Sequence, residues 1–110
     1  MTKICNLDDI SDGESIGLTV EIGGNAKMLI AVRRGDSAYI YINSCPHIGA
    51  PLDLQPGNFL THDKKHLLCS THGALFEIDT GHCTFGPCKD DHLEVLPIKI
   101  ENGEILSLAS

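Results

Sequence analysis

Two short stretches of the sequence combine cysteine with histidine at spacings that suit a metal centre. Cys45-Pro46-His47 is a C-x-H pattern, Cys69-Ser70-Thr71-His72 is a C-x-x-H pattern, and 21 residues (48–68) separate them. A glycine, Gly49 or Gly73, follows each histidine within two residues and lets the backbone turn tightly around a bulky inorganic group. Two thiolates and two imidazoles complete a metal site, and this donor set selects zinc or iron–sulfur. The four predicted ligands are Cys45, His47, Cys69 and His72.

The order of the cysteines and histidines along the chain helps to distinguish a zinc site from an iron–sulfur cluster. Structural zinc sites with two cysteines and two histidines usually keep like ligands together, as C-x2-4-C followed by H-x3-5-H. Here each stretch contains one cysteine and one histidine. A binuclear cluster with two unlike irons suits this order, because each loop can send its cysteine to one iron and its histidine to the other. A structural zinc domain remains the alternative, and such a protein would be colourless.

The four ligand positions resemble the motif of the Rieske [2Fe–2S] family, C-x-H followed by C-x-x-H. The resemblance extends over residues 39–108. It implies one [2Fe–2S] cluster per subunit, with Cys45 and Cys69 on the inner iron. It implies further that His47 and His72 hold the outer iron near the surface, where imidazole ligation raises the reduction potential.

Four positions at which the chain differs from some family members indicate which subgroup of the family it resembles. Rieske proteins of the respiratory and photosynthetic complexes carry an extra cysteine in each loop, where this chain has Ala50 and Thr71. High-potential members also place serine and tyrosine after the second His-Gly, where this chain has Ala74 and Phe76. The resemblance therefore implies no disulfide between the loops and a low reduction potential, about −150 mV. Gly86-Pro87 resembles the proline-containing loop that covers the cluster.

Short segments of alternating apolar residues, separated by turn signals, predict an all-β antiparallel domain. Gly23-Gly24-Asn25 and Asn102-Gly103 are the clearest turn signals. The expected strands are 3–7, 16–22, 28–32, 38–42, 59–61, 65–69, 75–78, 82–84, 93–100 and 105–108. The resemblance implies a Rieske-type antiparallel β-sandwich or barrel with a two-loop cluster-binding subdomain. We expect one domain over residues 1–110, with the subdomain at about residues 43–88.

The composition of the chain limits which kinds of partner it can bind and indicates the cellular compartment. The chain has 110 residues and a formal net charge of −7, which argues against nucleic acid and anionic membranes. The charge favours a docking partner with a basic patch, although solubility alone explains it equally well. No apolar run approaches the roughly 18 residues that span a membrane. Of five cysteines, two as ligands leave Cys5, Cys83 and Cys88, an odd number that favours a reducing compartment, the cytoplasm.

The remaining chemistry-bearing residues form no second motif. Four histidines have no cysteine at ligand spacing and are expected at the surface or in loops: His62, His66, His82 and His92. The sequence contains no Ser-His-Asp order, phosphate loop or carboxylate pair that predicts a catalytic site. The chain is therefore expected not to be an enzyme by itself.

A small acidic Rieske chain resembles the ferredoxins of bacterial ring-hydroxylating dioxygenase systems. The resemblance implies an electron carrier between an NAD(P)H-dependent flavin reductase and a terminal oxygenase, docking near His47 and His72. The oxygenase subunits add a much longer domain with a 2-His-1-carboxylate iron, for which 110 residues leave no room. The alternative is the small subunit of an assimilatory nitrite reductase or another accessory Rieske subunit. Several members of that group have lost the ligands, whereas all four are present here.

Overall fold

The computed structural model describes residues 2–44, 59–61, 63–69, 73–86 and 90–108. Within these residues the secondary structure is antiparallel β-strand with one short 3-10 helix, as predicted. The elements are β1 (Thr2–Asn6), η1 (Leu7–Asp9), β2 (Ser15–Ile22), β3 (Asn25–Arg34), β4 (Ser37–Ile42), β5 (His66–Cys69), β6 (Ala74–Glu77), β7 (Cys83–Phe85), β8 (Ile98–Glu101) and β9 (Glu104–Ser107). No helix in the described part of the chain is long and apolar enough to cross a membrane.

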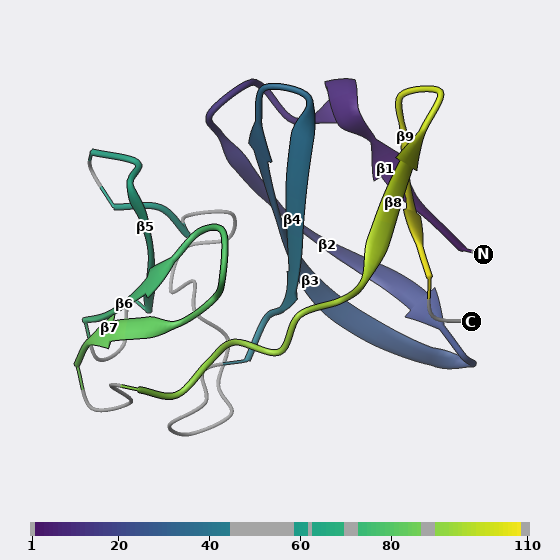
Figure 1. Cartoon of the computed structure of the whole chain (residues 1–110). Helices are drawn as coiled ribbons and strands as arrows, with labels where there is room; N and C mark the ends of the chain where they lie inside the picture. The colour runs from purple at the N-terminus through teal and green to yellow at the C-terminus, as the bar shows by residue number, and fades with distance from the viewer. Residues whose placement is uncertain (1, 45–58, 62, 70–72, 87–89, 109–110) are drawn as a thin grey trace.

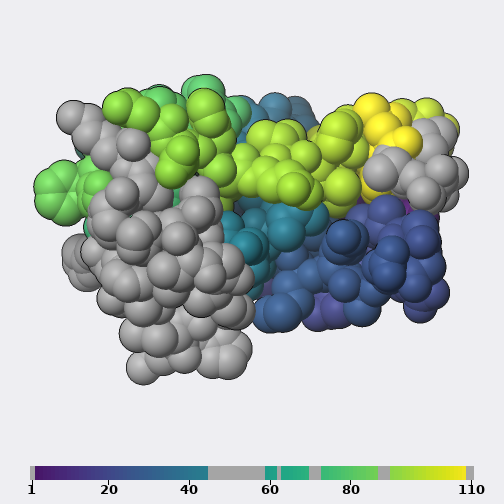
Figure 2. All heavy atoms as spheres, turned by 90° about the horizontal axis from the view of Figure 1, so that it is seen from below, coloured from purple at the N-terminus to yellow at the C-terminus, as the bar shows by residue number. Residues whose placement is uncertain are grey.

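The strands form three antiparallel sheets, ordered β2-β3-β4, β1-β9-β8 and β5-β6-β7. The first two sheets, which we call the base, lie together with both chain termini (Figure 1). The β5-β6-β7 sheet, which we call the small sheet, lies at the other end of the molecule (Figure 1). Residues 90–97 bridge the small sheet and the C-terminal strands in the view from below (Figure 2). The chain thus leaves the base after β4 and returns to it before β8.

Residues 29–32 of strand β3 are buried on both faces of the strand and separate two hydrophobic cores. Successive side chains of a strand point to opposite faces. Leu29 and Ala31 accordingly pack in the base core, whereas Ile30 and Val32 pack in a second core that includes residues of the small sheet. Strand β4 divides in the same way, with Ile40 in the base core and Tyr41 in the second core. The small sheet is therefore packed against strands β3 and β4 of the base.

The segment 93–100 differs from the strand expected there. Leu93 and Leu96, three residues apart, are buried, whereas Val95 between them is 55% exposed, so the expected alternation was wrong. The Leu96 N–H donates to the Ile40 carbonyl at 2.9 Å, which ties this segment to the edge of β4. Pro97 has no N–H to continue that ladder. Regular pairing resumes only at Ile98, in the other base sheet.

A second difference concerns residues 59–61, which were expected to form a strand. They make a single bridge, Leu60 with Leu67 of β5. The Phe59 carbonyl accepts the Leu68 N–H at 2.7 Å. This short stretch still extends the edge of β5.

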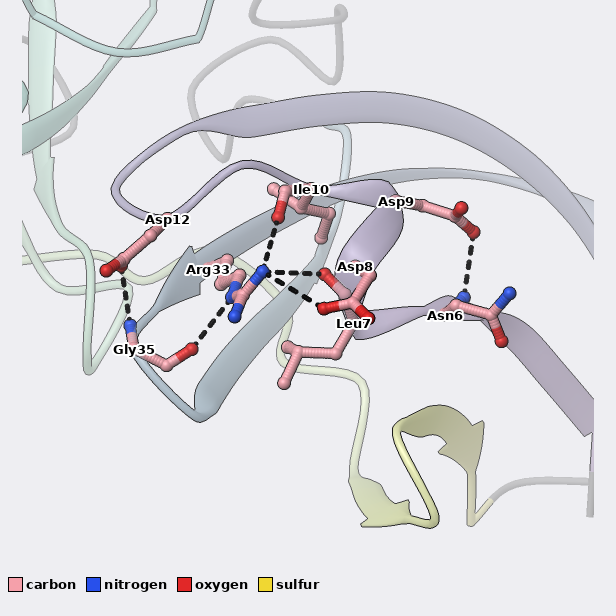
Figure 3. A network of polar contacts seen from close by, with 8 residues as sticks. All are labelled: Asn6, Leu7, Asp8, Asp9, Ile10, Asp12, Arg33 and Gly35. Atoms are coloured by element: carbon pink, nitrogen blue, oxygen red, sulfur yellow. Dashed lines mark hydrogen bonds and ion pairs between the residues drawn. The ribbon is translucent and has the colours of Figure 1, made fainter.

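Arg33 at the end of β3 binds the β1–β2 connection to the β3–β4 turn (Figure 3). Its Nη1 donates to the Ile10 carbonyl at 3.0 Å and lies 3.5 Å from Asp8 Oδ1, while Nε donates to the Gly35 carbonyl at 2.8 Å. Asp12 completes the arrangement, because its Oδ1 accepts the Gly35 N–H at 2.7 Å. The Arg33 side chain is 19% exposed, so these bonds are partly shielded from water.

Replacing Arg33 by alanine is expected to lower the free energy of unfolding by about 2–3 kcal/mol, because the carbonyl of buried Ile10 loses this charged donor. Arg34→Ala is the matched control. Arg34 is exposed, and its Nη2 donates to the Lys64 carbonyl at 3.2 Å, its one hydrogen bond to a side chain or carbonyl that the structure describes, so its loss is expected to cost about 0.5 kcal/mol or less. Urea unfolding of the two variants gives both values, and equal losses would contradict a special role for Arg33.

Candidate metal centre

The small sheet holds both ends of the segment that contains the second Cys-x-x-His motif. Cys69 at the end of β5 pairs with Ala74 at the start of β6. The Gly73 N–H donates to the Cys69 carbonyl at 2.8 Å, and Gly73 has φ +71°, a conformation that favours glycine. The described residues before and after the rest of this motif, Cys69 and Gly73, therefore lie at adjacent ends of two paired strands.

Cys69 has the environment expected of a ligand to a buried iron. It is 0% exposed and packs in the second core with Ala74, Phe76 and Cys83. A thiolate in such apolar surroundings is unfavourable unless a cation stabilises the charge. Iron provides that charge, and thiolate is its usual ligand in iron–sulfur clusters. The chemistry of this position fits the [2Fe–2S] cluster.

The strand before the first motif reaches the same core. Tyr41 of β4 packs in the core that contains Cys69. Beyond it, the Asn43 N–H donates to the Met28 carbonyl at 2.8 Å, and the Ser44 N–H to the Ile42 carbonyl at 2.9 Å. The backbone is thus anchored up to residue 44. The two strands that precede the two motifs converge on one core.

A close backbone contact follows β7. Gly86 has φ +105°, and a Cβ at this position would lie 2.7 Å from Ala74 Cα and 3.0 Å from Ala74 Cβ. Only glycine permits this approach, because backbone atoms cannot move aside cheaply. The chain therefore enters the predicted proline loop in direct contact with the strand that follows the second motif.

Further contacts hold the small sheet against the base. The buried Tyr41 hydroxyl donates to the Ile78 carbonyl at 2.6 Å, and a Cβ on Gly81 would lie 2.8 Å from Tyr41 Cε1. Burial, followed by the charge of nearby Asp79, raises the pKa of Tyr41 above its ordinary value. The hydroxyl thus stays protonated and keeps donating. Sequence reasoning missed Tyr41, because only its cross-sheet partners distinguish it from any strand tyrosine.

The structure places one of the four predicted ligands, Cys69. Cys45, His47 and His72 lie outside the described residues, as do His62, Pro87 and Cys88. Across the ranges that are described, no three or more His, Cys, Asp or Glu side chains gather as a metal site. The four-ligand set therefore remains a prediction, supported at Cys69.

The histidines outside the motifs that the structure describes lie at or near the surface, as expected. The His82 and His92 rings are 5.2 Å apart between centroids, and His82 Nε2 is 3.7 Å from Asp90 Oδ1. His66 lines a groove of about 240 Å³ together with Arg34. Cys83, in contrast, is buried, and its thiol donates to the Phe85 carbonyl at 3.3 Å.

The family model of the Rieske [2Fe-2S] domain matches residues 1–100. The chain belongs to the Rieske [2Fe–2S] domain family. Membership implies one [2Fe–2S] cluster, which confirms the predicted cofactor. The all-β class predicted from the strand and turn pattern, and the Rieske-type fold implied by the resemblance, are confirmed as well.

Solved structures of ferredoxins resemble the chain along its whole length. The ferredoxin of carbazole 1,9a-dioxygenase from Nocardioides aromaticivorans IC177 is 25% identical, with TM-score 0.73 and 100% of both chains covered. A chain of the complex of reduced oxygenase and oxidized ferredoxin in carbazole 1,9a-dioxygenase is 28% identical, with TM-score 0.73, and 96% of this chain and 98% of that chain are covered. The Sphingomonas yanoikuyae B1 ferredoxin is 24% identical, with TM-score 0.71 and coverages of 96% and 94%. No curated protein matches the sequence.

Proposed function

We propose that this Rieske protein carries single electrons from an NAD(P)H-dependent flavin reductase to a terminal ring-hydroxylating oxygenase. The observation that carries the proposal is the end-to-end match, at 25% identity, to the ferredoxin of a carbazole dioxygenase. A second similar structure is described as a complex of oxygenase and ferredoxin. These matches favour a carrier over an accessory subunit of a nitrite reductase. As a carrier, the protein performs no reaction on the substrate itself.

The proposed ligands are those of the two motifs, with Cys45 and Cys69 on the inner iron and His47 and His72 on the outer iron. When bound, the cluster accepts and releases one electron at a potential that imidazole ligation holds above that of all-cysteine clusters. Cys69 keeps its thiolate away from water, since it is fully buried. Partner proteins are proposed to dock near His47 and His72. The proposed compartment is the reducing cytoplasm, which suits an odd number of cysteines, five.

Electron transfer to an oxygenase is the direct test. The protein, reduced with dithionite and freed of excess reductant, is mixed without oxygen with the terminal oxygenase purified from the source organism. The expected result is reoxidation by one electron per cluster, followed through the visible absorbance and the low-temperature EPR signal. In a complete system with NADH and reductase, omission of this protein is expected to abolish product formation. Reoxidation by a sirohaem nitrite reductase and by no oxygenase would overturn the proposal.

A further inference from the structure

Phe85 is a large aromatic side chain exposed at the end of β7. It is 63% exposed, whereas Phe59 and Phe76, the other phenylalanines of the chain, are 1% and 0% exposed. Burying an aromatic side chain of this size is worth roughly 2–3 kcal/mol. Leaving Phe85 in water forgoes that stabilisation unless another surface covers it.

A β-bulge points Phe85 outward. Phe76 pairs with Cys83 and Leu75 pairs with Phe85, so Thr84 is the extra residue. Without the bulge, residue 85 would lie on the same face as the buried Cys83, because alternate side chains share a face. The bulge places it instead on the face of Leu75, and bulges commonly re-aim side chains near functional sites.

Phe85 completes an apolar stripe across the outer face of the small sheet. Leu68 of β5 pairs with Leu75 of β6, and Leu75 pairs with Phe85 of β7. Leu68 and Leu75 are partly exposed, so the stripe has one apolar residue on each strand. A shallow open hollow of about 410 Å³ adjoins it, lined by Thr61, Asp63, His66 and Leu75. An apolar centre beside polar side chains is the usual composition of a protein interface.

Each residue of the stripe is adjacent in sequence to one of three residues that lie side by side on the small sheet, and one of these three is Cys69, the predicted ligand of the inner iron. Cys69 pairs with Ala74, and Ala74 contacts Gly86, so these residues directly follow or precede members of the stripe along their strands. Two strand spacings separate β5 from β7, which puts Phe85 Cα about 10 Å from Cys69 Cα. The Cys69 side chain points to the opposite, buried face, so the thickness of the small sheet separates a protein seated on the stripe from this predicted ligand.

The charge of the chain indicates what kind of surface would cover the stripe. The net charge is −7. Beside the stripe, the Thr61 hydroxyl and the Lys65 N–H donate to Asp63 Oδ1 at 2.6 and 3.1 Å and hold the pKa of Asp63 below its ordinary value. Asp63 is thus ionised at neutral pH, but the adjacent Lys64 and Lys65 are exposed basic residues, so the negative charge is that of the chain as a whole. A partner with basic side chains complements that net charge and speeds the encounter.

We infer that the outer face of the small sheet, centred on the Leu68–Leu75–Phe85 stripe, docks the terminal oxygenase, with Phe85 inserted into an apolar pocket that basic side chains surround. The inference rests on the proposed function. It commits to the oxygenase because a structure similar to this chain is described as a complex of ferredoxin with oxygenase. Phe85 acts in binding and leaves the cluster unchanged.

The test uses the holoprotein and three variants, Phe85→Ala, Phe85→Leu and Leu108→Ala. Leu108 is the matched control, because it is 52% exposed and belongs to the base, where its N–H donates to the Pro97 carbonyl at 3.0 Å. The dissociation constant for the terminal oxygenase that wild type reduces is measured by calorimetry. Phe85→Ala is expected to raise it about tenfold or more, as for a buried aromatic anchor. Phe85→Leu is expected to restore most of the affinity, and Leu108→Ala to change it less than about twofold.

Two further readouts separate docking from other effects. The visible spectrum, the reduction potential and the rate of reduction by the flavin reductase are expected to be the same in Phe85→Ala and wild type. Affinity for the oxygenase unchanged in Phe85→Ala would overturn the inference and leave the proposed function standing. If Phe85→Ala slowed reduction of the protein by the flavin reductase as much as it weakened binding to the oxygenase, the assignment of this surface to the oxygenase would be overturned. Wild type that transfers no electron to any oxygenase would overturn the proposed function, and the inference with it.

Discussion

Cys69→Ala is expected to be purified without the [2Fe–2S] cluster, with iron falling from two atoms per chain to background and loss of the red-brown colour. The reason is that Cys69 is fully buried at the start of the second motif, where water cannot reach to replace a thiolate ligand. Iron analysis and the visible spectrum of the protein, expressed with added iron and sulfide sources, give the result.

Cys83→Ala is the matched control for Cys69→Ala. Cys83 is also 0% exposed and lies in the same core, so both substitutions remove the same buried sulfur volume. Each is expected to cost about 1 kcal/mol or somewhat more in packing. Only Cys69→Ala should lose iron. A full cluster in Cys69→Ala would remove Cys69 from the ligand set, whereas loss of iron from both variants would point to packing rather than ligation.

Gly86→Ala is expected to lower the free energy of unfolding by about 3 kcal/mol or more, because two unfavourable terms combine. The residue has φ +105°, and the new Cβ would overlap backbone and side-chain atoms of Ala74. The predicted proline loop starts at this residue, so we also expect faster release of iron to a chelator. Urea unfolding and the loss of visible absorbance with time measure the two effects.

Gly24→Ala separates the two terms. Gly24 has φ +83° in the turn between β2 and β3, and a Cβ there meets no atom within 4 Å. This variant carries the backbone strain without the overlap, and it should lose about 1 kcal/mol and retain its iron. Similar losses in Gly24→Ala and Gly86→Ala would show that the contact with Ala74 is unimportant.

The identity of the metal centre was readable from the sequence because ligand chemistry is local. A cysteine and a histidine with one or two residues between them, occurring twice, restrict the metal before any fold is known. Turn signals and period-2 alternation are local too, and they predicted the all-β antiparallel class and most strands. The prediction failed at 93–100, where Pro97 and the transfer between two sheets interrupt the alternation.

The sequence by itself determined the family, the cofactor and the residue types of the proposed site, since these depend on short spacings. The tertiary structure decided how the site is supported and where a partner is inferred to bind. The bulge that exposes Phe85, the contact of Gly86 with Ala74 and the bond from Tyr41 to Ile78 all depend on register between strands. Register is set by pairing between segments distant in sequence, so no local pattern contains it.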